Sequence, residues 1–354
     1  MSSLARLGWS SFFEQDRDSD DSSLRARVIE EQRGAYRLAG EYDGWGEVSG
    51  RFRHEAASPA DYPAVGDWVC VRAGESRALV ERRLPRRTTV SRAAAGRAIE
   101  QQVIAANVET IFIVTAAVDD LNERRVERYL TMIWDAGAVP VVVVNKADLA
   151  VDPHSLVDRL RDRFAFVDIV AVTAVAEDGL APLTAYLKPA STIALVGSSG
   201  VGKSTIVNRL VGGDRQRTAT IRESDGRGRH TTTSRQLIEL PGGALLIDTP
   251  GMRELTPWTD EAAVDGAFDD VATLAGECRF SDCRHQTEPG CAVLSAVESG
   301  VLDPDRLENY RRLIREAAFE ERKHDKAAAA GLKRHWKKLH KAQRALYRDR
   351  NRLK

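Results

Sequence analysis

The sequence lacks any apolar run close to the roughly 18 residues that a membrane-spanning helix needs. Residues 1–6 also lack the apolar core of a secretory signal, so we expect a cytoplasmic protein with no membrane partner. Cysteine is scarce too: of the four in the 354-residue chain, Cys70 stands alone and Cys278, Cys283 and Cys291 are clustered. In a cytoplasmic chain such a cluster favours a metal site over disulfides.

The sequence has no net charge, because 52 lysines and arginines balance 52 aspartates and glutamates. The charge is unevenly spread: residues 16–21 are acidic, whereas residues 332–354 carry ten basic side chains against Asp349. This basic end could meet polyanions. Leucine recurs there at every seventh residue, which indicates a helix docking one apolar stripe, since a coiled coil needs more heptads. The length and the 43% hydrophobic content predict a globular chain of two or three domains.

A small β-domain is indicated between Leu24 and Leu84 by short apolar stretches broken by glycine. The expected strands lie at residues 28–29, 35–38, 46–52 and 67–71. A five-stranded barrel of the oligonucleotide-binding (OB) kind fits this size, although another small β-barrel fits the same pattern. A basic connector follows, and it could either touch phosphates or be a solvated linker. Its arginines are Arg82, Arg83, Arg86, Arg87 and Arg92.

Strands and helices alternate from Ile104 to about Leu255, which predicts an α/β domain. A helix is expected over residues 124–136, with one apolar face, and another over residues 205–210. Continuous apolar strands separated by helices are typical of a parallel sheet covered on both faces. The expected strands are residues 110–114, 139–144, 169–172, 192–196 and 244–247.

A glycine-rich loop between an expected strand and an expected helix matches the pattern that cradles nucleotide phosphates. Its N–H groups and the helix N-terminus would hold the phosphates. Lys203 would reach the β- and γ-phosphates, and Ser204 would hold Mg²⁺. The predicted phosphate-loop residues are Gly197, Ser198, Ser199, Gly200, Val201, Gly202, Lys203, Ser204 and Thr205.

A second motif, Asn145-Lys146-Ala147-Asp148, indicates that the base is guanine. The Asp148 carboxylate can accept hydrogen bonds from the ring N–H and the exocyclic amine of guanine, which adenine cannot match. Lys146 would lie across the base, and Asn145 would tie this loop to the phosphate loop. Thr173 and Ala174, at the next strand end, would complete the base pocket. In an ordinary GTPase the phosphate loop comes first, so here the order of the two motifs is rotated.

The run Asp248-Thr249-Pro250-Gly251 ends another apolar strand. Asp248 would support Mg²⁺ through water, and the Gly251 N–H would meet the γ-phosphate. Among the three threonines at residues 231–233, Thr232 is our choice for a switch hydroxyl that reaches Mg²⁺.

Met252 occupies the position where a water-positioning glutamine often stands. Methionine cannot orient water by a hydrogen bond, so intrinsic hydrolysis should be slow and a partner could complete the site. His230 is a candidate internal substitute for the glutamine. The alternative is that His230 serves the conformation of the switch or a partner contact.

The cysteine cluster has the spacing Cys278-x4-Cys283-x-His285-x5-Cys291. Three thiolates and one imidazole suit tetrahedral Zn²⁺ in a closed structural site, so we assign the metal to architecture and not to catalysis. A reduced group without metal is the alternative. Cys70 is interpreted as a buried strand residue.

These motifs together resemble one family, the ribosome small subunit-dependent GTPase A (RsgA) proteins. The rotated motif order, the Gly-Arg-His-Thr-Thr-Thr run at 228–233, the metal-site spacing and the Val65-Gly66-Asp67 stretch carry the resemblance, which spans about residues 25–320. It implies an OB-fold barrel, a circularly permuted P-loop GTPase domain and a mostly helical C-terminal zinc domain. It also implies GTP hydrolysis stimulated by the small ribosomal subunit late in its assembly, with binding near the decoding centre and contacts to 16S rRNA.

The expected organisation has five parts and a monomeric chain that uses GTP/GDP, Mg²⁺ and one structural Zn²⁺. Two other functions remain open: a GTPase acting on another RNA or protein complex, and a non-enzymatic RNA-binding protein gated by GTP. The parts are a disordered acidic N-terminus (1–23), an OB-fold domain (24–90), a permuted GTPase domain (91–258), a zinc-binding helical domain (259–325) and a basic C-terminal helix or tail (326–354).

Overall fold

The computed structural model divides into two compact units, and each is described by itself. One unit comprises residues 1–92 and 101–257, and the other comprises 93–100 and 258–354. Among the helices described, none is long and apolar enough to cross a membrane. The structure describes residues 3–15, 23–32, 34–93, 101–118, 120–164, 166–212, 235–248 and 268–315.

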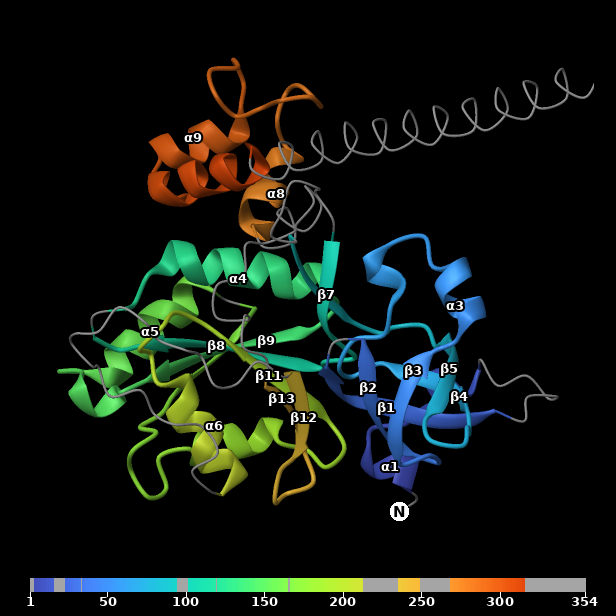
Figure 1. Ribbon diagram of the computed structural model, residues 1–354. Helices are drawn as coiled ribbons and strands as arrows, with labels where there is room; N and C mark the ends of the chain where they lie inside the picture. The colour runs from blue at the N-terminus through green and yellow to red at the C-terminus, as the bar shows by residue number, and fades with distance from the viewer. Residues whose placement is uncertain are drawn as a thin grey trace, which may run out of the picture. The chain divides into compact units, whose positions relative to one another are not determined.

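The N-terminal part of the first unit is a closed five-stranded barrel (Figure 1). Its strands follow the order β1-β2-β3-β5-β4, and β4 pairs back with β1. Alternate residues such as Val28, Leu38 and Val69 point inward and form its core. The predicted barrel is confirmed. Its strands are β1 (Leu24–Gln32), β2 (Ala35–Gly40), β3 (Gly44–Val48), β4 (Trp68–Arg72) and β5 (Ala78–Arg83).

The predicted strand at 46–52 is wrong beyond Val48, because helix α3 (Gly50–Glu55) begins there. Ser49 caps this helix by accepting a hydrogen bond from the Phe52 N–H at 3.1 Å. The Phe52 side chain is buried against the barrel core. A short 3₁₀ turn, η1 (Pro59–Asp61), follows before β4.

The N-terminal segment is ordered from residue 3 to residue 15, where disorder was expected. Short helices α1 (Ser3–Arg6) and α2 (Ser11–Glu14) flank Trp9. Trp9 meets Trp68 of β4 edge to face at 4.9 Å between ring centroids, and Phe13 is buried beside them. This aromatic packing holds the segment against the barrel, which acidity alone did not reveal.

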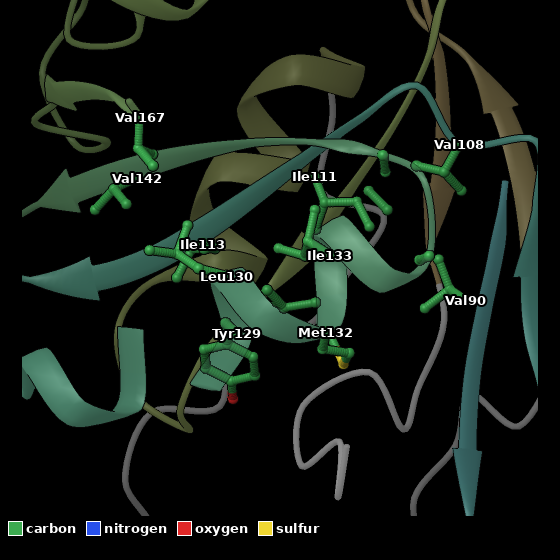
Figure 2. Packing of buried hydrophobic residues seen from close by; sticks show 14 of the residues in the cluster. Val90, Val108, Ile111, Ile113, Tyr129, Leu130, Met132, Ile133, Val142 and Val167 are labelled. Atoms are coloured by element: carbon green, nitrogen blue, oxygen red, sulfur yellow. The ribbon is translucent and has the colours of Figure 1, made fainter. Parts of the chain in front are cut away.

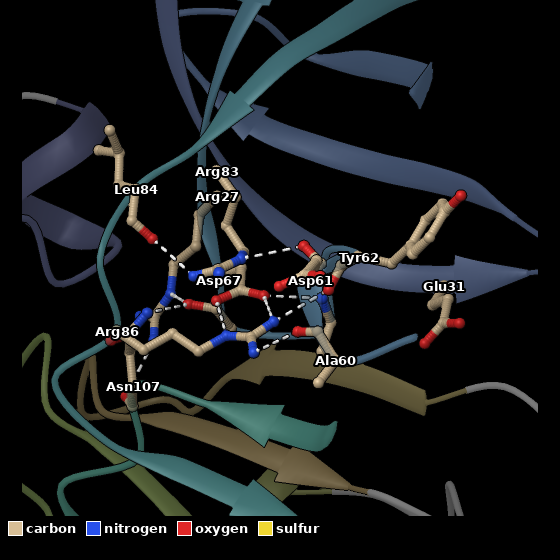
Figure 3. A network of polar contacts seen from close by, with 12 residues as sticks. Arg27, Glu31, Ala60, Asp61, Tyr62, Asp67, Arg83, Leu84, Arg86 and Asn107 are labelled. Carbon is tan, nitrogen blue, oxygen red and sulfur yellow. Dashed lines mark hydrogen bonds and ion pairs between the residues drawn. The ribbon is translucent and has the colours of Figure 1, made fainter. Parts of the chain in front are cut away.

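Two arginines of the basic connector, Arg82 and Arg83, belong to β5 of the barrel, and a third, Arg86, forms a buried ion pair. Arg86 donates two hydrogen bonds, of 2.8 and 2.7 Å, to the Asp67 carboxylate (Figure 3). It also donates to the backbone carbonyls of residues 60 and 62. The side chains of Asp67 and Arg86 are 0% and 8% exposed. Because the Arg86 guanidinium is buried, neither of the two interpretations of the connector, phosphate contact or solvated linker, holds for it.

Replacing Arg86 by alanine is expected to destabilise the protein by about 3–5 kcal/mol, because it leaves the Asp67 charge buried without its partner. Denaturant unfolding would measure the loss. The matched control is Arg72→Ala, which removes an ion pair to Glu81 between side chains that are 67% and 39% exposed. That change should cost about 1 kcal/mol or less. Equal losses for the two variants would argue against a structural role for the buried pair.

The GTPase part of the first unit is built on five parallel strands in the order β10-β9-β8-β11-β13. The predicted parallel sheet is confirmed. An antiparallel strand, β12 (Arg235–Glu239), follows at its edge and also pairs with β1 of the barrel, so one sheet runs through both parts. The parallel strands are β8 (Thr110–Ala116), β9 (Val139–Asn145), β10 (Asp168–Ala171), β11 (Thr192–Val196) and β13 (Leu245–Asp248).

Both faces of this sheet are covered, as the continuous apolar strands predict. Ile111 and Ile113 of β8 face helices α4 (Glu123–Asp135) and α5 (Pro153–Arg163) (Figure 2). Phe112 and Val114 face the other side, where helix α6 (Lys203–Val211) and the turn η3 (Ala181–Tyr186) pack. A two-stranded ladder of β6 (Thr89–Ala93) and β7 (Gln101–Ala106) completes the described strands.

The second unit is mostly helical in its described part. It contains α8 (Asp269–Ala275) and α9 (Ala292–Glu298), and residues 304–315 are also helical. Phe268 is fully buried and packs against Tyr310 at 5.5 Å between ring centroids. The predicted basic tail at 326–354 lies outside the described residues.

Candidate nucleotide site and metal centre

The loop after β11 has the backbone that a phosphate cradle requires. Gly197 and Gly202 have φ angles of 139° and 97°, in the region that favours glycine. A Cβ at Gly197 would lie 2.1 Å from the Val114 carbonyl oxygen, and one at Gly202 would lie 2.2 Å from Asn145 Nδ2. The buried Ser198 Oγ has no hydrogen-bond partner among the described residues, so a phosphate oxygen could satisfy it. Helix α6 begins at Lys203, and its N-terminal N–H groups suit an anion.

Lys203 is held inside this loop. Its ammonium donates to the Gly197 carbonyl at 2.6 Å and also to the Ser198 carbonyl. The residue is 9% exposed, so the charge is fixed at the start of the helix. Ser204 follows in the first turn of α6 and is half-buried.

Asn145 joins three loops at one edge of the sheet. Its Nδ2 donates to the Val201 carbonyl at 2.8 Å, and its Oδ1 accepts from the Ala174 N–H at 3.1 Å. Asn145 is 2% exposed. The carboxyl ends of β9, β10 and β11 therefore bring the Asn145 motif, the phosphate loop and the Thr173-Ala174 loop together, although some 50 residues separate the first two in sequence.

The residues after Asn145 form a turn that ends the strand. Lys146 has a left-handed backbone with φ 58°, and Ala147 N–H donates to the Val172 carbonyl at 3.1 Å. Asp148 lies in the turn η2 (Ala147–Leu149) and is exposed. Its carboxylate is accessible from solvent.

Two residues that support the Thr173-Ala174 loop were not found by sequence reasoning. Arg209 of α6 donates to the carbonyls of Ala174, Val175 and Ala176 at 3.2, 2.6 and 2.9 Å. Gly179 closes the loop by accepting from the Thr173 N–H at 3.1 Å, and a Cβ there would come within 1.8 Å of the Thr173 carbonyl oxygen. The helix that starts at the phosphate loop thus also fixes this second loop.

The four metal-ligand candidates of the second unit converge. Their ligand atoms all lie within 4.8 Å of one another. The sulfurs of Cys278 and Cys291 are 3.8 Å apart, and His285 Nδ1 lies 3.6 and 3.5 Å from them. A tetrahedral site with Zn–S bonds of about 2.3 Å has S···S edges of about 3.8 Å, so the donor set fits Zn²⁺.

Comparison with known proteins identifies a family. The profile described as RsgA GTPase matches residues 83–258. A small ribosomal subunit biogenesis GTPase RsgA from Opitutus terrae is 45% identical, with 97% of each chain covered. The chain belongs to the RsgA GTPase family. Membership makes it a GTP-hydrolysing enzyme and implies GTP/GDP and Mg²⁺ as ligands.

Other relatives and solved structures agree with RsgA membership. A small ribosomal subunit biogenesis GTPase RsgA 2 from Lactiplantibacillus plantarum is 43% identical, with 90% of each chain covered. The crystal structure of YjeQ from Thermotoga maritima is similar with a TM-score of 0.63 and 25% identity, covering 83% of this chain and 98% of that one. YloQ, described as a circularly permuted GTPase, has a TM-score of 0.61 at 22% identity, which shows the same fold.

The switch residues predicted for this RsgA-family chain fall partly outside the described structure. Asp248 ends β13, is half-buried, and lies in register with Gln236 of β12. His230, Thr232, Gly251 and Met252 lie outside the described residues. The described structure therefore includes the candidate base-reading residues and the phosphate loop.

Several hydrogen bonds surround the Cys278, Cys283, His285 and Cys291 cluster of this RsgA-family chain. Burial alone would raise the pKa of Cys278, but hydrogen bonds from the N–H groups of Val293 and Ala292, at the start of α9, lower it. Glu288 ties the loop around His285 by accepting from the N–H groups of residues 284, 286 and 287. Arg311 donates to the His285 carbonyl. These contacts hold the loop that carries the candidate ligand His285.

Proposed function

We propose that this protein binds GTP and Mg²⁺ at the edge described and hydrolyses GTP during late maturation of the small ribosomal subunit, in the cytoplasm. The proposal is based on the two hydrogen bonds of the Asn145 side chain. They connect the base-reading motif to the phosphate loop and to the Thr173-Ala174 loop. The names of the relatives supply the partner. The OB-type barrel suits contact with 16S rRNA through backbone charge and base stacking, and the chain would act as a monomer.

In this proposal the site residues divide by the part of the nucleotide they serve. Asp148 reads guanine, Lys146 covers it, and Thr173 and Ala174 complete its pocket. Lys203 neutralises the β- and γ-phosphates while residues 197–202 donate N–H groups to them. Mg²⁺ would be held by Ser204, Thr232 and, through water, Asp248. Gly251 would meet the γ-phosphate, and His230 would orient the attacking water in place of the missing glutamine.

The proposed function is tested by phosphate release under multiple turnover, with and without purified small ribosomal subunits. Strong stimulation by the subunits is expected, since Met252 cannot position the attacking water and intrinsic hydrolysis should therefore be slow. The Lys203→Ala protein provides the blank. Intrinsic turnover without stimulation would point to another partner complex. Absence of turnover in both conditions would favour the GTP-gated RNA-binding alternative, which family membership disfavours.

The second unit is proposed to hold one structural Zn²⁺ on Cys278, Cys283, His285 and Cys291. The purified protein should contain about one zinc per chain, and Cys283→Ala should lose most of it because a closed four-ligand site needs every donor. Metal analysis of both proteins measures this. The matched control is Cys70→Ala, which removes a buried cysteine of the barrel and should retain zinc. Full zinc content in the Cys283→Ala protein would rule out this ligand set.

A further inference from the structure

Strand β12 links the barrel to the strand that carries Asp248. Gln236 lies in register with Asp248 of β13 on one side and with Glu30 of β1 on the other. A sheet edge without β1 would expose a row of unpaired N–H and C=O groups. The barrel strand thus completes the edge of the GTPase sheet at the level of Asp248.

The middle of β1 is hydrogen-bonded to the first residue of β11, the strand that leads into the phosphate loop. Arg27 is 1% exposed and donates to the Asn107 carbonyl at 3.2 Å (Figure 3). It also donates to Thr192 Oγ1 at 3.0 Å. Burial lowers the pKa of Arg27 to about 10, so it stays charged at neutral pH. Thr192 begins β11, which leads into the phosphate loop. Arg27 therefore holds β1 in place relative to that loop.

The C-terminal end of β1 is joined to β12 by an ion pair. Glu31 Oε2 lies 3.3 Å from Arg235 Nη1, and the two side chains are 29% and 14% exposed. The pKa of Arg235 is lowered by burial, and the nearby Glu31 charge offsets part of this effect. The two residues are also opposite each other in the strand register. A partly buried pair of this kind holds its strands together more strongly than an exposed one.

We infer that Glu31 and Arg235 are positioning residues for GTP hydrolysis. Their ion pair fixes the position of β12 relative to the barrel. Because Gln236 of β12 is in register with Asp248, the position of β12 in turn sets the position of the Asp248 carboxylate, which supports Mg²⁺. The inference rests on the proposed role of Asp248. The consequence is that the barrel and the Mg²⁺ site are directly coupled. Because β1 pairs with β12, any ligand that shifts β1 also shifts β12.

The test uses charge reversal and charge exchange in the full-length protein. Glu31→Arg and Arg235→Glu should each lower kcat for GTP and raise the Mg²⁺ concentration needed for tight GTP binding, both by about fivefold or more. GTP affinity without Mg²⁺ should stay unchanged. The double exchange, Glu31→Arg with Arg235→Glu, should return kcat and the Mg²⁺ requirement most of the way to their unmodified values. Glu31→Gln is a milder change that should also lower kcat and raise the Mg²⁺ requirement. It replaces the reversal variants in the test if they fail to fold.

Glu239 at the other end of β12 provides the matched control. It forms an exposed ion pair with Arg6 at 2.8 Å and lies in register with Leu245, at the far end of β13 from Asp248. Glu239→Arg should leave kcat and the Mg²⁺ dependence of binding unchanged. Single reversals that lower only the melting temperature, or a double exchange without rescue, would overturn the inference. Because Mg²⁺-dependent GTP binding requires no turnover, this result is independent of whether small subunits stimulate hydrolysis.

Discussion

Replacing Lys203 by alanine is expected to lower kcat/KM for GTP hydrolysis by at least about a hundredfold, the cost of removing one fixed group that stabilises transition-state charge. The ammonium is held by the carbonyls of Gly197 and Ser198 at the start of α6. No other described lysine lies in this loop. Its loss removes the positive charge proposed to face the β- and γ-phosphates, while the glycine backbone stays in place.

The matched control for this change is Lys188→Ala. Lys188 precedes β11 at the opposite end of that strand from the phosphate loop. Its replacement should leave hydrolysis within about twofold of the unmodified rate, because exposed surface changes away from a site have small effects. Steady-state phosphate release measures both variants. A Lys203→Ala protein that hydrolyses GTP at the normal rate would remove the phosphate loop from the mechanism.

Replacing Asp148 by asparagine is expected to change the nucleotide preference from guanine to xanthine. The carboxylate accepts from the ring N–H and the exocyclic amine of guanine, whereas the amide presents a donor that suits the 2-oxo group of xanthine. A site built on paired hydrogen bonds rejects the mismatched base by up to about 10⁴-fold. The exposed position of Asp148 in η2 allows this exchange without disturbing the core.

Competition between GTP and xanthosine triphosphate for a fluorescent nucleotide measures this change. Asp152→Asn is the control, since it makes the same substitution four residues later. Asp152 caps α5 by accepting from the Ser155 N–H at 3.0 Å, and asparagine caps helices equally well. GTP affinity should fall only in the Asp148→Asn protein. Unchanged GTP affinity there would show that another group reads the base.

The parts of the molecule that local patterns determine were predictable. The phosphate loop, the Asn145 motif and the cysteine cluster are short stretches whose chemistry depends on spacing, and the continuous apolar strands indicate a parallel sheet. Short apolar stretches broken by glycine likewise indicated the barrel. The prediction of a strand over residues 46–52 was wrong from Ser49 onward, because helix caps and strand ends favour the same small polar residues.

The remaining features depend on contacts between distant residues, which no local pattern contains. Arg86 was one of several arginines in a basic stretch, and its pairing with Asp67 depends on how the barrel closes. The acidic N-terminus suggested disorder, yet Trp9 and Phe13 pack on Trp68. Arg209 carries no motif because its function depends on where α6 brings it. The pairing of β1 with β12 joins two domains and is a tertiary property.

The central claim is that the Asn145 motif and the phosphate loop form one guanine-nucleotide site although their order in the chain is rotated. The direct measurement is a titration of the purified protein with a fluorescent GTP analogue in Mg²⁺, displaced in turn by GTP, GDP and ATP. GTP and GDP should displace the analogue, while ATP should be weaker by at least about a hundredfold. Failure to retain the analogue, or displacement by ATP as readily as by GTP, would contradict the claim.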